Sequence, residues 1–373
     1  MKSSLIIFFA LSILSFKSLA KDANTPIENQ GDHVRSDFIV PTTTSTAFPF
    51  SGSEITMPNG QRLRYYTSDT STQKKPLVLF VPGSGCTGAF ASLPDGHRTM
   101  GPETFALEFE KRARLVVVEN PGIEERFARE TDSGCSSTFK EMANMQARLE
   151  ALQTIVADLR RRGWIDHQPF MIVASSEGVS IATRFAALSK NVSHLLLISG
   201  FGIGHTLATI HTALTGSGDY WGFIPATESN DPLSRLQSTL ARWEQVRRDQ
   251  GHKSSETTAG YQAAYWRTIG LASSAEDALA SNAQLYLVQG GRDQNAPAVN
   301  YGAGIAYLVT HDRSFVSEYI PCGDHFLMCP DDGEEPKNLQ GVIVRGMEWF
   351  LTAQVKRSSA VSFDPLATLK QPF

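Results

Sequence analysis

Uninterrupted runs of apolar residues recur along most of the chain and alternate with segments whose apolar residues follow a helical spacing. A continuous run, unlike an alternating one, is typical of a strand that is covered on both faces in a parallel sheet. Five such runs predict strands over Leu77–Val81, Leu115–Val118, Phe170–Ala174, Leu195–Ile198 and Leu285–Gln289, and a sixth strand is predicted over Phe315–Ile320, where Ser317 and Glu318 interrupt the apolar residues. Their alternation with helices predicts an α/β fold, a mostly parallel sheet covered by helices on both faces.

The segments between these runs supply the predicted helices. They are Pro102–Arg112, Phe139–Arg162, Val179–Leu188, Val299–Thr310 and Leu339–Val355. Ahead of the first run, Ile55–Met57 and Arg62–Thr67 flank an Asn-Gly turn and predict two antiparallel strands at one edge of the sheet.

Residues 200–282 interrupt the alternation of strands and helices. They are rich in glycine and aromatic residues and contain three helical stretches but no convincing strand: Pro232–Arg248, Tyr261–Gly270 and Ala275–Asn282. We therefore predict a helical cap inserted into an α/β core that comprises residues 51–199 and 283–357. Six aromatic residues of this segment either line an acyl or aromatic pocket or pack the cap onto the core: Tyr220, Trp221, Trp243, Tyr261, Tyr265 and Trp266.

The two ends of the chain do not resemble the core. Residues 1–20 have a basic start, an apolar run over Leu5–Phe16 and a small-x-small cleavage site at Ser18–Ala20, which is typical of a signal peptide. The run is too short for a comfortable membrane span, so we expect no span in the mature chain and an exported protein, periplasmic or secreted. Residues 21–50 are predicted to form a polar leader and residues 358–373 a loose tail.

Charge and composition narrow the classes of partner. The net charge of −4 and the lack of a basic block argue against binding of nucleic acid or of an anionic membrane surface. No group of His, Cys, Asp and Glu has the spacing of a metal site, and no Gly-Lys-Ser/Thr follows the glycine-rich loop after the first strand. We expect no metal or cofactor, and a small molecule as substrate. The sequence gives no indication of the oligomeric state.

The strand Phe170–Ala174 passes into a helix within three residues, through Ser175-Ser176-Glu177-Gly178. So sharp a turn lifts the side chain at its centre above the sheet edge, at the positive end of the helix. Small residues on either side let the neighbouring backbones approach. The pattern is that of the nucleophile elbow G-x-S-x-G, with Ala174 at the first glycine position and Ser176 at the nucleophile position.

Four segments in this chain order resemble the α/β-hydrolase superfamily, in particular its serine esterases and lipases with an inserted cap. They are Pro82-Gly83-Ser84-Gly85, the elbow at Ser176, Gly290-Gly291-Arg292-Asp293 and Gly323-Asp324-His325. The superfamily uses the order nucleophile, acid, histidine. The chain departs from the pattern at Ala174, where small size suffices, and at Pro82, where many members carry histidine.

The resemblance implies a role for each matched residue. Ser176 would be the nucleophile, His325 its general base and Asp293 the acid that orients the imidazole. Asp324 and Glu119 are weaker candidates for the acid. The backbone N–H groups of Ser84 and Glu177 would bind the oxyanion. Asp293 also has a simpler interpretation as a turn residue before Pro297.

The favoured function is hydrolysis of a carboxylic ester through an acyl-enzyme. A serine aminopeptidase or prolyl-type peptidase of the same fold is the nearest alternative, and in it the Glu177 side chain would bind a substrate amine. Otherwise Glu177 is an exposed carboxylate at a helix start. A third interpretation, from another class, is a binding protein of this fold without turnover.

Four cysteines in an exported chain are expected to form disulfides, and four allow three pairings. Cys322 and Cys329 lie close in sequence on either side of His325, which favours their pairing. That choice leaves Cys86 to pair with Cys135 as the second candidate disulfide. Free buried thiols are the alternative for either pair.

Overall fold

The computed structural model describes residues 36–39, 48–92, 98–127, 134–165, 170–216, 231–248, 257–258, 261–332 and 337–357. The predicted signal peptide and C-terminal tail lie outside the described residues, together with most of the polar leader and with Tyr220 and Trp221.

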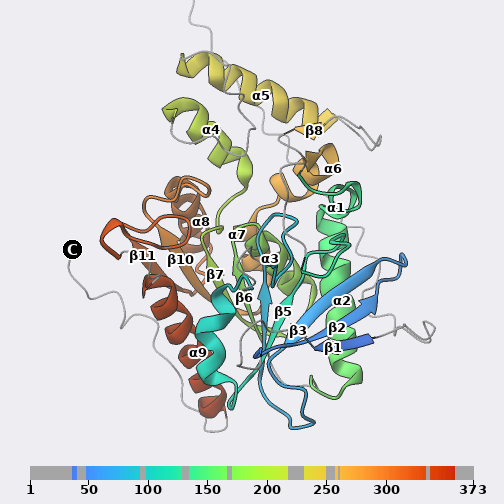
Figure 1. Ribbon diagram of the computed structural model, residues 1–373. Coiled ribbons are helices and arrows are strands. Elements are labelled where there is room, and N and C mark those ends of the chain that lie inside the picture. Colours follow the sequence, from blue (N-terminus) through green and yellow to red (C-terminus); the bar gives the residue numbers. More distant parts are fainter. Residues whose placement is uncertain are drawn as a thin grey trace, which may run out of the picture. The chain divides into compact units, whose positions relative to one another are not determined.

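A nine-stranded sheet in the order β1-β2-β3-β5-β4-β6-β7-β10-β11 forms the centre of the fold (Figure 1). Its strands are β1 (Ser36–Ile39), β2 (Ser51–Thr56), β3 (Arg62–Thr67), β4 (Leu77–Val81), β5 (Arg114–Val118), β6 (Phe170–Ser175), β7 (Val192–Ile198), β10 (Gln284–Gly290) and β11 (Val316–Ile320). The first three are antiparallel. The other six pair in parallel and correspond to the six predicted strands, which confirms the predicted mostly parallel sheet.

Successive side chains of a strand point to opposite faces, so each central strand contributes to two hydrophobic cores. In β4, Leu79 and Val81 pack into one core, and Val78 and Phe80 into the other. The first core is covered by α2 (Met145–Arg161), α3 (Gly178–Leu188), α7 (Ser274–Ala280) and α8 (Ala298–Thr310). The second is covered by α9 (Lys337–Arg357) and the 3₁₀ helix η1 (Pro102–Phe109), which lie side by side in Figure 1.

The long helix predicted over Phe139–Arg162 is two helices, α1 (Ser137–Met142) and α2. The break occurs because the Asn144 side chain accepts a hydrogen bond from the Ala147 N–H at 3.0 Å and caps the start of α2. The segment predicted as an unstructured leader contains β1, which pairs antiparallel with β2. The helix predicted at Pro102 is the 3₁₀ helix η1.

Residues 200–282 form several short elements. They are α4 (His205–Thr215), α5 (Pro232–Arg248), β8 (Thr257–Thr258), β9 (Tyr261–Gln262), α6 (Ala263–Tyr265), the π-helix η2 (Trp266–Gly270) and α7. The antiparallel pair β8–β9 corrects the expectation that this segment has no strand. Figure 1 shows α4 and α5 against each other, away from the sheet, whereas α7 packs on α3.

The described aromatic residues of this segment mostly pack against one another. Trp243, Tyr265 and Trp266 are buried, and the Trp266 ring meets the other two edge to face, with centroids 5.9 Å and 5.0 Å away. Such packing favours the structural interpretation of these three side chains over a pocket lining.

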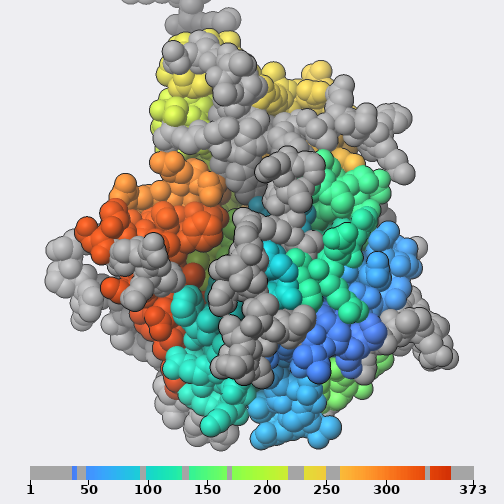
Figure 2. Space-filling model, in the orientation of Figure 1, coloured from blue at the N-terminus to red at the C-terminus, as the bar shows by residue number. Residues whose placement is uncertain are grey.

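β1 and β11 are the two edge strands of the sheet, and the described chain ends in α9, which packs against η1. On the face drawn in Figure 2 the last third of the chain (orange and red) gathers on the left and the first strands (blue) on the right. None of the helices within the described ranges is long and apolar enough to cross a membrane.

Candidate active site

Ser176 occupies a sharp turn between β6, which ends at Ser175, and α3, which starts at Gly178. Its φ of +53° lies in the left-handed region that few residues other than glycine adopt. The Ser176 N–H donates to the Ile198 carbonyl at 2.9 Å, and the Val179 N–H donates to the Ser176 carbonyl at 3.0 Å. These bonds hold a strained backbone, as the elbow pattern predicts.

Two glycines let neighbouring backbones reach this turn. A Cβ atom on Gly178 would lie 2.5 Å from the Pro82 carbonyl oxygen, and one on Gly200 would lie 2.2 Å from the Ser176 carbonyl oxygen. Real Cβ contacts are never so short, so both positions require glycine. Gly178 belongs to the predicted motif. Gly200 follows β7 and was missed, because only the sheet order brings it to the elbow.

The loop after β4 lies beside the Ser176 side chain. A Cβ atom on Gly83 would be 3.0 Å from the Ser176 Cβ and 3.5 Å from its Oγ. The Asn120 Nδ2 donates to the carbonyls of Gly83 and Gly85, at 3.0 Å each, and so fixes the loop. Within the described part of the chain, the backbone N–H groups of Ser84 and Glu177 donate no hydrogen bond.

A buried ion pair joins this loop to the elbow. Arg148 of α2 lies 2.9 Å from the Glu177 carboxylate through Nη1, and its Nη2 donates to the Pro82 carbonyl at 3.0 Å. Both side chains are almost fully buried, at 4% and 2% exposure. Burial raises the pKa of Glu177, against the opposing effect of the Arg148 charge. The expectation of an exposed carboxylate is wrong, and Arg148 occupies the carboxylate that a substrate amine would need.

Asp293 and His325 meet at the ends of β10 and β11. The His325 Nδ1 lies 3.0 Å and 2.9 Å from the two carboxylate oxygens of Asp293. Asp293 Oδ1 also accepts the backbone N–H groups of Asn295 and Ala296, and Oδ2 accepts the Gln289 side chain. The Asp293 side chain is fully buried, and that of His325 is 14% exposed. These hydrogen bonds engage the Nδ1 of His325 and can orient the ring, and they leave its Nε2 available for another partner.

Asp324 and Glu119 have other partners. The Asp324 carboxylate accepts the backbone N–H groups of Phe326 and Met328, at 2.8 Å and 2.9 Å, and so shapes the loop that carries His325. Glu119 is buried, forms an ion pair with Arg64 at 2.8 Å and accepts the Tyr66 hydroxyl. Neither carboxylate is hydrogen-bonded to the imidazole, so the geometry favours Asp293 over both as the acid.

Two disulfides flank the loops of the site. Cys86 is bonded to Cys135, and Cys322 to Cys329, the pairing expected from sequence distance. The second closes a loop of a few residues around His325.

The structure thus forms two of the contacts expected of the site, Asp293 with His325 and Gly83 with Ser176. It contains no hydrogen bond between Ser176 and His325, both of which are described. In unliganded sites such a contact is often longer than a hydrogen bond.

No family model matches the chain, and no curated protein matches it. Solved structures do. A puromycin-hydrolyzing peptidase of Mycobacterium tuberculosis covers 85% of this chain at 15% identity and a TM-score of 0.50. An acylaminoacyl peptidase of Pyrococcus horikoshii covers 85% at 15% identity and 0.52, and a putative dipeptidyl aminopeptidase IV of Bacteroides ovatus covers 80% at 12% identity and 0.51. The chain has the fold of the α/β-hydrolase superfamily.

The chain spans 40%, 43% and 35% of the length of those three proteins, so the likeness establishes the fold alone. In that fold, nucleophile, acid and histidine follow one another along the chain. Ser176, Asp293 and His325 stand in that order at the ends of β6, β10 and β11.

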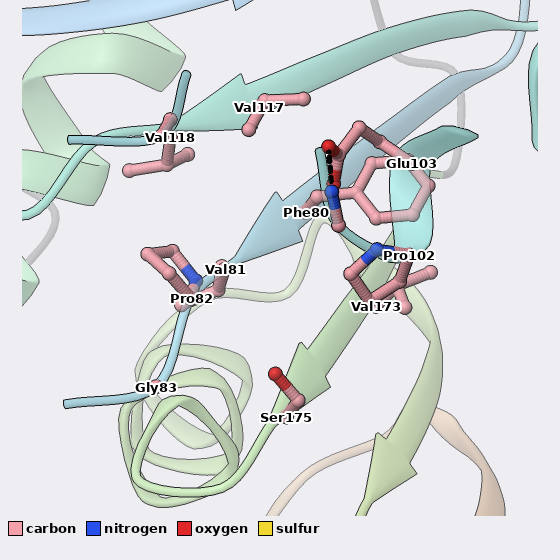
Figure 3. A pocket seen from close by; sticks show the side chains of 12 residues that line it. Phe80, Val81, Pro82, Gly83, Pro102, Glu103, Val117, Val118, Val173 and Ser175 are labelled. Atoms are coloured by element: carbon pink, nitrogen blue, oxygen red, sulfur yellow. Dashed lines mark hydrogen bonds between the residues drawn. The ribbon is translucent and has the colours of Figure 1, made fainter. Parts of the chain in front are cut away.

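Two cavities adjoin the candidate residues of the α/β-hydrolase fold. One, of about 880 Å³, is lined by Asp293 and His325 and by His211 of α4. The other, of about 160 Å³, is lined by Gly83 and Ser175 (Figure 3). In the parts of the chain that the structure describes, no three His, Cys, Asp or Glu side chains are grouped so as to hold a metal.

Proposed function

We propose that the chain is an exported serine hydrolase that cleaves carboxylic esters through an acyl-enzyme, with Ser176, His325 and Asp293 as its triad. The observation that carries the proposal is the Asp293–His325 hydrogen bond at the sheet edge where the strained turn presents Ser176. A serine hydroxyl is a weak nucleophile at neutral pH and needs a base of this kind.

Each group then has one task. Asp293 fixes the tautomer of His325 that carries its proton on Nδ1, which leaves Nε2 free to take the proton of Ser176. The Ser176 Oγ attacks the ester carbonyl carbon, and His325 returns the proton to the leaving alcohol. A water molecule, activated by the same imidazole, cleaves the acyl-enzyme.

The negative charge that develops on the carbonyl oxygen needs hydrogen-bond donors. The N–H groups of Ser84 and Glu177, which have no partner among the described residues, are the proposed donors. Each donor of this kind stabilises the transition state by roughly 3–4 kcal/mol. Gly83, next to the Ser176 Cβ, leaves room for the carbonyl group.

Ester substrates are favoured over peptides because the feature that suggested a peptidase has another partner. Glu177 would have to release Arg148 before it could bind a substrate amine, and that would leave a buried guanidinium unpaired. The pair of disulfides supports export, since such bonds persist in oxidising compartments.

A fluorophosphonate probe tests the proposal. It should label the wild-type protein at Ser176, and Ser176→Ala should abolish labelling and reduce ester turnover by several orders of magnitude while circular dichroism stays unchanged. Ser175→Ala is the matched control, one residue away, and should keep the label. A folded wild-type protein that neither reacts with the probe nor hydrolyses esters would instead be a binding protein.

A further inference from the structure

The smaller of the two cavities lies between the ends of β4, β5 and β6 and the start of η1 (Figure 3). Its walls are mainly apolar and include Phe80, Val117 and Val173. An enclosed apolar space of about 150 Å³ holds a molecule of the size of benzene, so this cavity of about 160 Å³ has room for roughly six carbon atoms.

This cavity adjoins the candidate nucleophile. It is lined by Ser175, the residue before Ser176, and by Gly83, whose Cβ position lies 3.5 Å from the Ser176 Oγ. The next residue of the loop, Ser84, carries a proposed oxyanion donor. A carbonyl group held by that donor therefore has the cavity beside it, and the absence of a side chain at Gly83 leaves this side unobstructed.

Among the residues that the structure describes, Glu103 is the one ionisable residue that lines the cavity. Its side chain lies with Phe80 on the side away from Gly83 in Figure 3, and it is 4% exposed. One carboxyl oxygen accepts the Gly101 N–H at 2.5 Å. Burial raises the pKa of this carboxyl, which shows how poorly the surroundings solvate a negative charge.

We propose that this cavity binds the acyl group of the ester and limits it to short, uncharged chains of up to about six carbon atoms. The inference rests on the proposed hydrolase function, because it requires an acyl group attached to Ser176. Apolar walls favour hydrocarbon, and the limited volume excludes longer chains. The same apolar surroundings, which solvate a negative charge poorly, disfavour a charged acyl chain.

Esters of 4-nitrophenol with straight-chain acids of two to twelve carbons share one leaving group and vary only in the acyl chain. For the wild-type protein, kcat/KM should rise about threefold to fourfold with each added methylene up to four to six carbons. It should then fall at least tenfold by the octanoate. A profile that keeps rising to ten or twelve carbons would overturn the proposal.

Two variants test the walls. Ala89 is half-buried and lines the cavity, and Ala89→Leu adds three carbon atoms, so the longest accepted chain should shorten by about three carbons with little change for the acetate. Ala187→Leu, at a half-buried position of α3 away from the cavity, should leave the profile unchanged. The wild-type protein should also prefer the pentanoate over the equally long glutarate monoester at least tenfold, because the apolar walls do not solvate the second carboxylate.

The outcomes separate this proposal from the hydrolase function. If the probe labels Ser176 and esters are cleaved without a chain-length limit, the acyl site is wrong and the hydrolase stands. If neither labelling nor cleavage occurs, both are wrong. The wild-type profile and the labelling suffice for this decision even if a variant fails to fold.

Discussion

Replacing Arg148 with methionine should lower both the stability of the fold and the turnover, for two different reasons that can be tested separately. The change leaves the buried Glu177 carboxylate without its ion-pair partner and the Pro82 carbonyl without its donor. Breaking a buried pair on one side costs about 3–5 kcal/mol, a large part of the stability of a typical domain. Denaturant unfolding followed by circular dichroism measures this loss.

The effect on turnover follows from what Arg148 holds. It connects the loop that carries one proposed oxyanion donor to the residue that carries the other, Glu177. One donor contributes roughly 3–4 kcal/mol to transition-state stabilisation. Because both donors should lose part of their alignment, we expect kcat to fall about a hundredfold, which corresponds to less than the loss of one whole donor. KM for a small ester should change little.

A second substitution distinguishes the two routes. In Arg148→Met with Glu177→Leu, no charge is left buried, and apolar replacement of a buried pair is often neutral or stabilising. Stability should therefore recover, while kcat should stay low because the Pro82 carbonyl remains unheld. If kcat in the single variant stays within twofold of wild type, the positioning argument is refuted.

The stability difference should also depend on pH. Because the pKa of Glu177 is raised in the folded protein, its stability contribution falls as pH rises from the unfolded pKa through the folded one. Loss of Arg148 raises the folded pKa further and extends this interval upward. Arg148→Met should therefore lose more unfolding free energy, relative to wild type, at about pH 8 than at about pH 5.

Two further predictions concern the loops that hold the proposed base. Asp293→Asn should keep the protein folded but lower turnover on the order of 10⁴-fold, whereas Asp324→Asn should mainly destabilise its loop; a larger catalytic loss in Asp324→Asn would reverse the assignment. Replacing Cys322 and Cys329 by serine should lower the free energy of unfolding by about 2.5 kcal/mol and should also lower turnover. Replacing Cys86 and Cys135, whose disulfide closes the longer loop, should lower the free energy of unfolding by about 4 kcal/mol. Unfolding curves of unreduced variants compare the two, and equal losses would contradict the chain-entropy reasoning.

Local pattern predicted most of the fold and the residues of the proposed triad. Five largely apolar runs and the mixed segment of β11 correspond to the six parallel strands, and the change from strand to helix around Ser176 lies within a few residues of sequence. A signal of this kind needs no knowledge of distant contacts. β1 gave no such signal, because it is short, largely exposed and polar in its surroundings.

The residues that sequence reasoning missed act across long separations. Asn120 reaches Gly83 from the end of a neighbouring strand, and Gly200 approaches Ser176 only through the order of β6 and β7. The break at Asn144 was missed for another reason. Apolar residues keep the helical spacing on both sides of it, so the pattern continues although the backbone does not.

Glu177 illustrates how burial decides between roles that the sequence leaves open. A carboxylate at a helix start, next to a nucleophile, can be exposed to solvent, bind a cationic group of the substrate or form a structural ion pair. Its partner Arg148 lies in another helix, and both are almost fully buried, so a substrate ammonium could gain Glu177 only by leaving the guanidinium unpaired. The free energy lost by leaving Arg148 unpaired is comparable to the free energy gained by pairing the ammonium with Glu177. Under the proposed function, we therefore expect specificity to come from groups that the ion pair does not occupy, in the cavities beside Gly83 and His325.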